Sequence, residues 1–234
     1  MDPVGVLVII AIVGGAVALV VWAQKASHRR LTARAQELGL AYVPDMPADE
    51  VNALQLPLMA RAASRGRRRG RISAPVTGTW QGMDVRLFTY AWDIQTRRKD
   101  GTTSTRTERY RCAVTSLPSE VPAITIESGG AFMGLVDRIE EAVTGGGGLR
   151  HVRFDTPEDF EEKVAVESAV ETRAREVLTD DARAWLMGQV REIEFQIGGV
   201  TVMALTSRTD VKDERLLEAL KGLRERLLPA LGGG

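Results

Sequence analysis

The side chains that most often perform chemistry are scarce in this sequence. The chain has 234 residues, with two histidines, His28 and His151, and one cysteine, Cys112. A nucleophile needs a base, and the base needs a third group that orients it. His151 with Asp155 or Glu158, serving Cys112 or a serine, is the only such assembly in the sequence. A lone histidine beside a predicted strand is more often structural, so we expect that the protein is not an enzyme.

Motifs for metals and cofactors are also missing from the sequence. A single cysteine excludes a disulfide framework and a cysteine-based zinc site. The glycine run at residues 145–148 follows a predicted helix and has no Gly-Lys-Ser/Thr after it, unlike a phosphate-binding loop. A cluster of acids lies at a predicted helix start: Glu158, Asp159, Glu161 and Glu162. Acids in a first helical turn usually are solvated partners of the helix dipole and not metal ligands. We therefore predict no metal and no cofactor.

An apolar run at the N-terminus is the strongest single signal. Residues 4–23 contain only Val, Ile, Leu, Ala, Gly and Trp. At about 1.5 Å per residue the run would span about 30 Å, which is the thickness of a bilayer core. The run is too long for a signal peptide, and its n-region is acidic rather than basic. We therefore expect a retained transmembrane helix over residues 4–23.

The flanking charges predict how this helix would be oriented. Asp2 precedes the run, and Lys25, Arg29, Arg30 and Arg34 follow it. Because positive residues stay on the cytoplasmic side, we expect a single-pass protein of the cell membrane. Its short N-terminus would lie outside, and its large domain would lie in the cytoplasm.

The neutral net charge conceals an uneven distribution. Residues 24–111 hold 17 basic and 8 acidic side chains, whereas residues 112–234 hold 14 and 22. The densest basic stretch is a candidate contact with anionic lipid, because each charge there gains about 1 kcal/mol near an anionic leaflet. A solvated loop is the alternative, and nucleic acid is disfavoured because no aromatic residue is interleaved. The candidate lipid-contact residues are Arg61, Arg65, Arg67, Arg68, Arg69 and Arg71.

Small residues within the apolar run form a second candidate set. They lie four positions apart, a spacing that lets two helices approach closely in lipid. The candidate helix-packing residues are Ala11, Gly14, Gly15 and Ala18.

Hydrophobic periodicity predicts the elements that would position any site. Alternating apolar residues and turn signals such as Gln81-Gly82 and Gly198-Gly199 predict strands and hairpins. We predict strands over residues 72–80, 83–94, 106–117, 123–127, 151–154, 164–166, 192–197 and 200–206. Spacing of three and four residues, with capping signals, predicts helices. We predict helices over residues 26–40, 132–143, 169–178, 180–190 and 210–231, and a further helix start at Thr156.

These elements together predict an α+β fold. The single transmembrane helix would be followed by an antiparallel or mixed β-sheet covered by amphipathic helices. Residues 1–3 would be the N-terminus, and residues 24–71 a basic helical stalk with an irregular linker. Residues 72–231 would be the cytoplasmic domain, and residues 232–234 a flexible tail. Within the polar loop at 95–105, Thr102–Thr105 is a candidate for phosphorylation, although a hydrophilic hairpin tip is the favoured interpretation.

The order of these segments resembles an uncharacterised family of membrane-anchored bacterial proteins, common in actinobacteria. The resemblance rests on the motifs at residues 87–90, 151–154 and 158–164, and on residues 174–179 before a helix at 185–187. It covers most of residues 28–230. It implies topology and fold, and it implies no catalytic residue.

These observations favour a membrane-tethered cytoplasmic module for binding or assembly. We expect contact with the membrane and with a protein partner or a second copy, and no contact with nucleic acid. The alternative is a module that senses anionic lipid or a small ligand through residues 61–71. A hydrolase-like enzyme is the third interpretation.

Overall fold

A seven-stranded, antiparallel β-sheet dominates the computed structural model of the chain. The model describes residues 25–44, 70–97, 102–129 and 148–232, with single positions at 19, 22, 23, 46, 50, 54 and 56. The strands are β1 (Ala41–Tyr42), β2 (Arg71–Trp80), β3 (Met83–Arg97), β4 (Thr103–Ser128), β5 (Arg150–His151), β6 (Val164–Ser168) and β7 (Glu194–Thr206). The helices are the N-terminal helix at residues 25–37, α6 (Phe160–Lys163), α7 (Glu171–Val177), α8 (Asp180–Leu186) and α9 (Asp213–Leu231).

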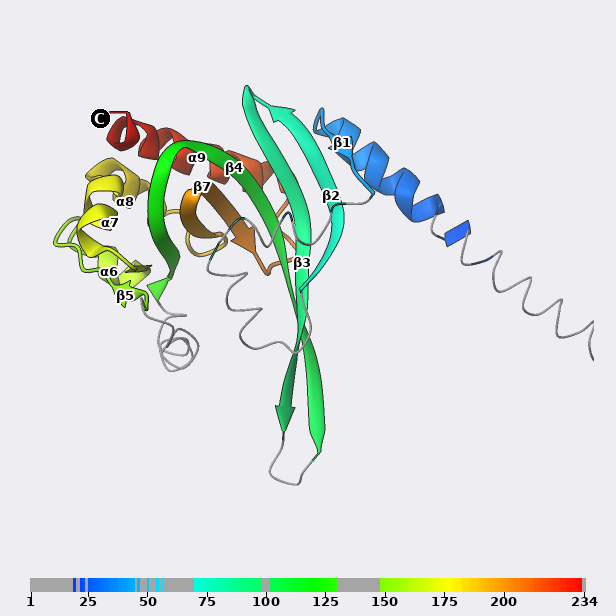
Figure 1. The fold of residues 1–234 in the computed structure, drawn as a ribbon, viewed down its shortest axis with the longest axis horizontal. Coiled ribbons are helices and arrows are strands. Elements are labelled where there is room, and N and C mark those ends of the chain that lie inside the picture. Colours follow the sequence, from blue (N-terminus) through cyan, green and yellow to red (C-terminus); the bar gives the residue numbers. More distant parts are fainter. Residues whose placement is uncertain are drawn as a thin grey trace, which may run out of the picture.

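Strand β4 organises the sheet because three other strands pair with it. The strand order is β1-β2-β3-β4-β6-β5, and β7 pairs with β4 outside this path. Residues 103–114 of β4 pair with β3, residues 111–126 pair with β7, and residues 124–128 pair with β6. Figure 1 shows β4 in green, curving around β7, while its first residues and the end of β3 project as a long two-stranded arm.

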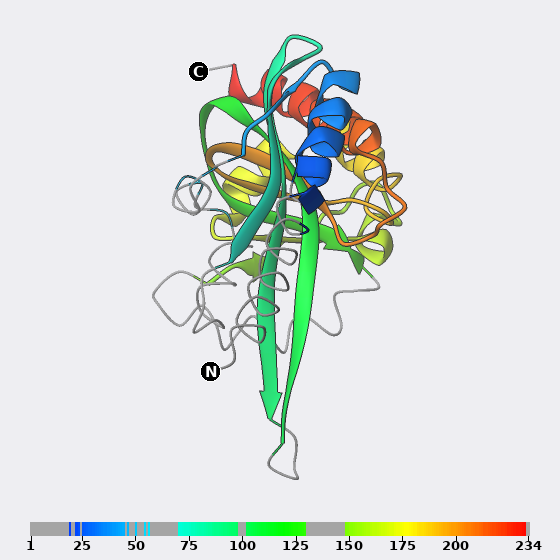
Figure 2. The ribbon, with the colours of Figure 1, turned by 90° about the vertical axis from the view of Figure 1, so that its right-hand side faces the viewer.

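Helix α9 covers one face of the sheet, and its buried residues belong to the larger of two hydrophobic clusters. It packs on β4 and β7, and Figure 2 shows it in red across the top of the domain. The fully buried leucines recur at helical spacing, as expected for an amphipathic helix on a sheet. They are Leu216, Leu217, Leu220, Leu223 and Leu227. A smaller core on the opposite face contains Phe88, Tyr90, Trp92 and Cys112.

A glycine in the middle of α9 makes room for an aromatic ring. A Cβ at Gly222 would lie 2.6 Å from Cζ2 of Trp185. The Trp185 ring is confined by Phe195, whose ring centroid is 5.7 Å away, and by the Arg226 guanidinium at 5.0 Å from its centroid. A Cβ at this position would press on the ring and force it or the helix to shift, so glycine fits here best.

We therefore expect Gly222→Ala to destabilise the fold, although alanine is the better helix former. The gain in helix propensity is about 1 kcal/mol, whereas overpacking costs about 1–3 kcal/mol. Urea unfolding should show a net loss of about 1 kcal/mol, and at most about 2 kcal/mol. Gly188→Ala is the matched control, because its Cβ would meet only the Trp185 carbonyl oxygen at 3.5 Å. Equal stability of the two variants would contradict the steric argument.

The predicted α+β class, with amphipathic helices covering the sheet, is wrong. The described residues form a mostly antiparallel sheet with few helices: α9 has 19 residues, but α6 has 4, and α7 and α8 have 7 each. The strands are longer than predicted, which leaves less of the chain for helices. The predicted helix at 132–143 lies outside the described residues.

The predicted transmembrane helix at residues 4–23 also lies outside the described residues, apart from Leu19, Trp22 and Ala23. Among the residues that the structure describes, no helix is both long enough and apolar enough to cross a membrane. The described N-terminal helix, residues 25–37, carries four arginine or lysine side chains. The described residues therefore give no support to the predicted transmembrane segment, the single-pass topology or the cell-membrane localisation.

Two predicted breaks in the sheet are absent from the observed strands. Pro118 and Pro122 lie inside β4, where shifts in the β4–β7 register between Ser116 and Ile124 accommodate them. Gly198-Gly199 does not form a hairpin, because residues on both sides of it pair with the same strand, β4. Gly199 has a φ of +56°, which bends β7 without ending it.

Candidate functional site

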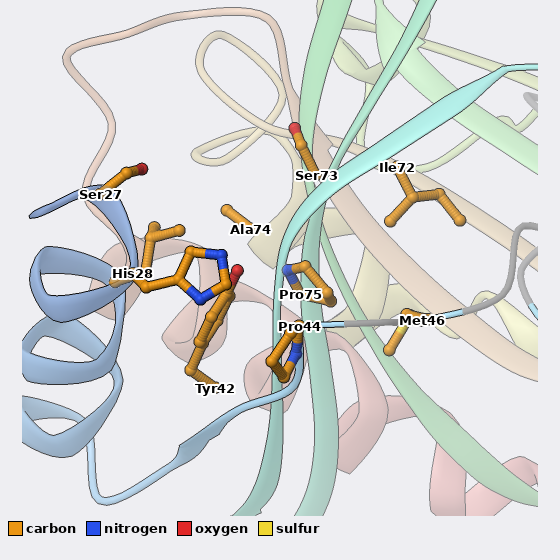
Figure 3. Close-up of a pocket in the computed structure, with 10 residues that line it drawn as sticks. Ser27, His28, Tyr42, Pro44, Met46, Ile72, Ser73, Ala74 and Pro75 are labelled. Atoms are coloured by element: carbon orange, nitrogen blue, oxygen red, sulfur yellow. The ribbon is translucent and has the colours of Figure 1, made fainter. Parts of the chain in front are cut away.

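A pocket of about 620 Å³ lies between the N-terminal helix, β1 and the start of β2. Figure 3 shows the helix side chains facing the β2 side chains across it. The wall is about equally polar and apolar, and its polar side chains come from Ser27, His28, Tyr42 and Ser73. Its apolar lining consists of Leu31, Pro44, Met46, Ile72, Ala74 and Pro75. Its volume lies in the range typical of binding pockets, and its lining is more polar than is usual for them.

The end of the N-terminal helix directs the chain back toward the sheet. Gly39 has a φ of +70°, and its N–H donates to the Gln36 carbonyl at 2.9 Å. The Leu40 N–H donates to the Ala35 carbonyl at 2.8 Å, which completes a Schellman motif. The chain then enters β1, and the Tyr42 ring meets the His28 ring edge-on at 5.4 Å. This turn therefore places both rings in the pocket wall.

A bulge in β2 forms the opposite wall. Ser73 is opposite Thr89 and Val76 is opposite Leu87, so Ala74 and Pro75 together oppose one residue of β3. Ala74 has a φ of +50°, which costs a residue with a side chain about 1–2 kcal/mol. The Ala74 carbonyl accepts a hydrogen bond from Arg111 at 3.2 Å, and the Pro75 carbonyl accepts one from the Val43 N–H at 3.0 Å. These bonds hold the strained backbone in place.

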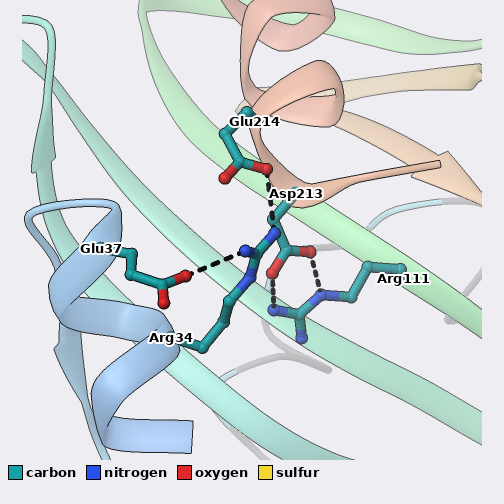
Figure 4. A network of polar contacts seen from close by, with 5 residues as sticks. All are labelled: Arg34, Glu37, Arg111, Asp213 and Glu214. Carbon is teal, nitrogen blue, oxygen red and sulfur yellow. Dashed lines mark hydrogen bonds and ion pairs between the residues drawn. The ribbon is translucent and has the colours of Figure 1, made fainter.

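An ion-pair network behind the pocket joins its walls to α9. Arg111 donates two hydrogen bonds to Asp213, from Nε at 2.8 Å and from Nη2 at 3.0 Å (Figure 4). Arg34 bonds Glu37 and Glu214, each at 3.0 Å. The hydrogen bond with Glu37 raises the pKa of Arg34 above its ordinary value. The network therefore connects the N-terminal helix, the β2 bulge and the first turn of α9.

Arg71, the described member of the predicted lipid and helix-packing sets, does not line this pocket. Arg71 is the one member of these sets among the described residues, and its Nη2 lies 3.1 Å from Asp93 Oδ1. Its side chain is 62% exposed. The others lie outside the described residues: Ala11, Gly14, Gly15, Ala18, Arg61, Arg65, Arg67, Arg68 and Arg69.

The residues of the hydrolase interpretation lie in different parts of the sheet. Cys112 is fully buried between Phe88 and Leu205 on the neighbouring strands, and burial raises the pKa of its thiol. His151 is exposed on the edge strand β5, opposite Glu167. The described residues contain no group of three His, Cys, Asp or Glu side chains that could hold a metal ion. Thr102 and the start of β4 belong to the projecting arm.

Two prolines in the sequence could have indicated the pocket, whereas hydrophobic periodicity gave no sign of it. Pro75 interrupts an otherwise regular strand pattern, and Pro44 lies two residues after the end of β1. Proline in a sheet occurs at bulges and on edge strands, so these two positions mark a bulged edge. Tyr42, Ser73 and Ala74 were not predicted as site residues, because the pocket brings together short segments with no shared motif.

Comparisons with known proteins show a similarity of fold. No protein-family model matches the sequence, and no curated protein matches it. The fold is similar to that of the mycobacterial trehalose monomycolate transport factor A, TtfA, with a TM-score of 0.57 and 12% sequence identity. The match covers 85% of this chain and 93% of that chain. The predicted family resemblance is not confirmed by a family model, and a mycobacterial neighbour is consistent with it.

Proposed function

We propose that this chain is a binding or assembly factor, not an enzyme, and that it holds a protein partner through the pocket between the N-terminal helix and the β2 bulge. The observation that carries the proposal is the way the pocket is built. Its bulged wall is strained, and hydrogen bonds from Arg111 and Val43 keep that wall in one shape. A wall that is already fixed loses little conformational entropy when a partner binds.

The chemical groups near the pocket support binding over catalysis. The carboxylates of Glu37, Asp213 and Glu214 are engaged with Arg34 and Arg111, so they stabilise the walls. The His28 ring packs edge-on against Tyr42. A base for catalysis needs a third group that orients it toward a nucleophile, and these contacts serve the fold instead.

The structural neighbour supports the same coarse role. Its name describes a transport factor for trehalose monomycolate. We carry over to this chain only the coarse role of a factor, and the binding of a partner is argued from the pocket alone. The proposal does not extend the neighbour's cargo to this chain.

Site-specific photo-crosslinking in cells of the native host tests the proposal. A benzophenone amino acid replaces Ser27 or Ser73, which are both exposed and both line the pocket. We expect a discrete adduct with one protein from each position. The same replacement at Thr79, exposed further along β2, is the matched control. Adducts that are absent from the pocket positions, or equally strong at Thr79, would overturn the proposed function.

A further inference from the structure

A group of acidic side chains lies on the face of the sheet opposite α9. Ile126, Val166 and Phe195 belong to the core that also contains the buried leucines of α9. Because successive side chains of a strand point to opposite faces, the polar residues next to these three share the other face. We call this surface the acidic face. Its members are Thr125 and Glu127 on β4, Glu167 on β6, and Glu194 and Gln196 on β7.

The strand register places two of these carboxylates side by side. Ile126 pairs with Phe195, and Glu127 and Glu194 are the next residues along the two antiparallel strands. Side chains at opposite positions of neighbouring strands are about 5 Å apart, and like charges at such positions destabilise a sheet. A cation between Glu127 and Glu194 would remove this repulsion.

Burial makes the need for a cation stronger. Glu127 is 6% exposed and Glu167 is 8% exposed, and buried carboxylates are costly unless they are paired. Thr125 is 2% exposed and lies opposite Glu167 on one side and Gln196 on the other. Its Oγ1 has no hydrogen-bond partner among the described residues. A buried hydroxyl of this kind indicates that a hydrogen-bond donor belongs beside it.

The segment of residues 57–69 begins and ends on the same side of the sheet as the acidic face. Leu56, which precedes it, is fully buried in the smaller core with Phe88 and Cys112. Gly70, which follows it, lies so close to Tyr90 of that core that a Cβ would be 2.2 Å from the ring. Both ends of the segment are therefore fixed on the face opposite α9.

The length of this segment is sufficient to reach the acidic face. Thirteen residues at about 3.4 Å each allow the chain to travel out and back over about 20 Å. Met203 lies in the core that contains Leu56, and Gln196 is seven positions away along β7, or about 23 Å at most. Long arginine side chains extend the reach of the backbone.

The charge of the segment is complementary to that of the acidic face. Residues 57–69 hold five arginines and no acid. Residues 130–147, which follow β4, hold three acids and one arginine, so their net charge disfavours the same place. A guanidinium group has five N–H donors in a planar fork, which suits carboxylates and can also serve a threonine hydroxyl.

We propose that residues 57–69 dock on the acidic face of their own chain, with guanidinium groups paired to Glu127, Glu167 and Glu194 and one N–H donated to Thr125 Oγ1. Arginines that neutralise the sheet in this way are withheld from an anionic membrane. The contact lies away from the pocket at the β2 bulge, so this inference and the proposed function stand or fall separately.

Urea unfolding of the purified full-length chain tests the docking. Four of the five arginines are replaced together: Arg65→Gln, Arg67→Gln, Arg68→Gln and Arg69→Gln. We expect the equilibrium constant for unfolding to rise at least about tenfold, because buried carboxylates lose their counter-charges. The matched control makes the same change at four exposed arginines, Arg106, Arg109, Arg153 and Arg191, and should stay within about threefold. Equal effects of the two sets would overturn the proposal.

A mutant cycle identifies the partner of the arginines. In a chain that carries Glu127→Gln and Glu194→Gln, the four arginine replacements should change the unfolding constant less than about threefold. Additive effects would overturn the proposal. If that chain does not fold, a carbodiimide is applied to the Arg67→Lys chain instead. An amide bond from position 67 to β4, β6 or β7 supports the docking, and the absence of such a bond overturns it.

Vesicle flotation distinguishes docking from lipid contact. The unchanged chain and the four-arginine variant are mixed with vesicles that contain phosphatidylserine. We expect the two chains to float to the same extent, because the docked arginines do not contribute to binding. Flotation that falls when the arginines are replaced would show that residues 57–69 serve the membrane, and the proposal would be wrong.

Discussion

Replacing Asp213 with asparagine is expected to lower the free energy of unfolding by about 3 kcal/mol. The side chains of Asp213 and Arg111 are only 14% and 20% exposed, and two hydrogen bonds of 2.8 Å and 3.0 Å join them. Removing one member of a buried pair leaves the other charge without compensation, which costs about 3–5 kcal/mol when burial is complete. Partial exposure of this pair places the expected loss at the lower end. Urea unfolding of the variant measures it.

The effect of Asp213→Asn should extend to the pocket. Arg111 also donates to the Ala74 carbonyl, so loss of its carboxylate partner loosens the support of the β2 bulge. We therefore expect the substitution to accelerate amide hydrogen exchange within residues 72–76. The exchange rates in the hairpin turn at the other end of β2 should change less.

Two controls separate the buried pair from ordinary surface charge. Glu176→Gln removes one member of an exposed pair, Arg173–Glu176, whose side chains are 37% and 61% exposed. Its loss should be below about 0.5 kcal/mol. In a double-mutant cycle with Arg111→Met, the interaction energy between the two residues should account for most of the stability lost in Asp213→Asn. Losses of equal size for Asp213→Asn and Glu176→Gln would contradict the structural role of the buried pair.

Local sequence signals predicted those parts of the fold that local interactions determine. The hairpin at Gln81-Gly82 is confirmed, with φ angles of +48° and +78° and Trp80 opposite Met83. The helix predicted to begin at residue 180 does begin there, and the Thr179 side chain caps it by accepting a hydrogen bond from the Ala182 N–H. The helix predicted over residues 210–231 corresponds to α9, whose buried leucines pack on the sheet. In each case the signal and the contact lie within a few residues of one another, or on one helix face.

Features that depend on distant pairing could not be read from local patterns. Gly198-Gly199 has the residues of a hairpin turn, but β4 is long enough to pair with both sides of it, and this pairing outweighs turn propensity. The pocket depends on Arg111 and Asp213, which are 102 positions apart in the chain. No periodicity encodes such a contact. The positive φ of Ala74 is equally hidden, because alanine disfavours that conformation and only its surroundings impose it.

Raising the pH from 7 to 10 is expected to remove about 2 kcal/mol of stability through Cys112 alone. Burial raises the pKa of the Cys112 thiol far above its ordinary value, so the folded chain keeps its proton in this range. The unfolded chain releases the proton near its ordinary pKa of about 8.5. The stabilising contribution is therefore complete below about pH 8.5 and is lost at about 1.4 kcal/mol per unit above it. Urea unfolding at several pH values, in reducing buffer, measures this loss.

Comparison with Cys112→Ala isolates the thiol from other groups that titrate in the same range. Burial also raises the pKa of Tyr90, so Tyr90 acts in the same direction at higher pH, but it is present in both proteins. At pH 7 the alanine variant should be less stable by about 1 kcal/mol, because the deleted sulfur leaves a small cavity beside Phe88 and Leu205. At pH 10 the order should be reversed, since the variant has no thiol to ionise on unfolding. Parallel stability curves for the two proteins between pH 7 and pH 10 would show that Cys112 is not held protonated by its surroundings.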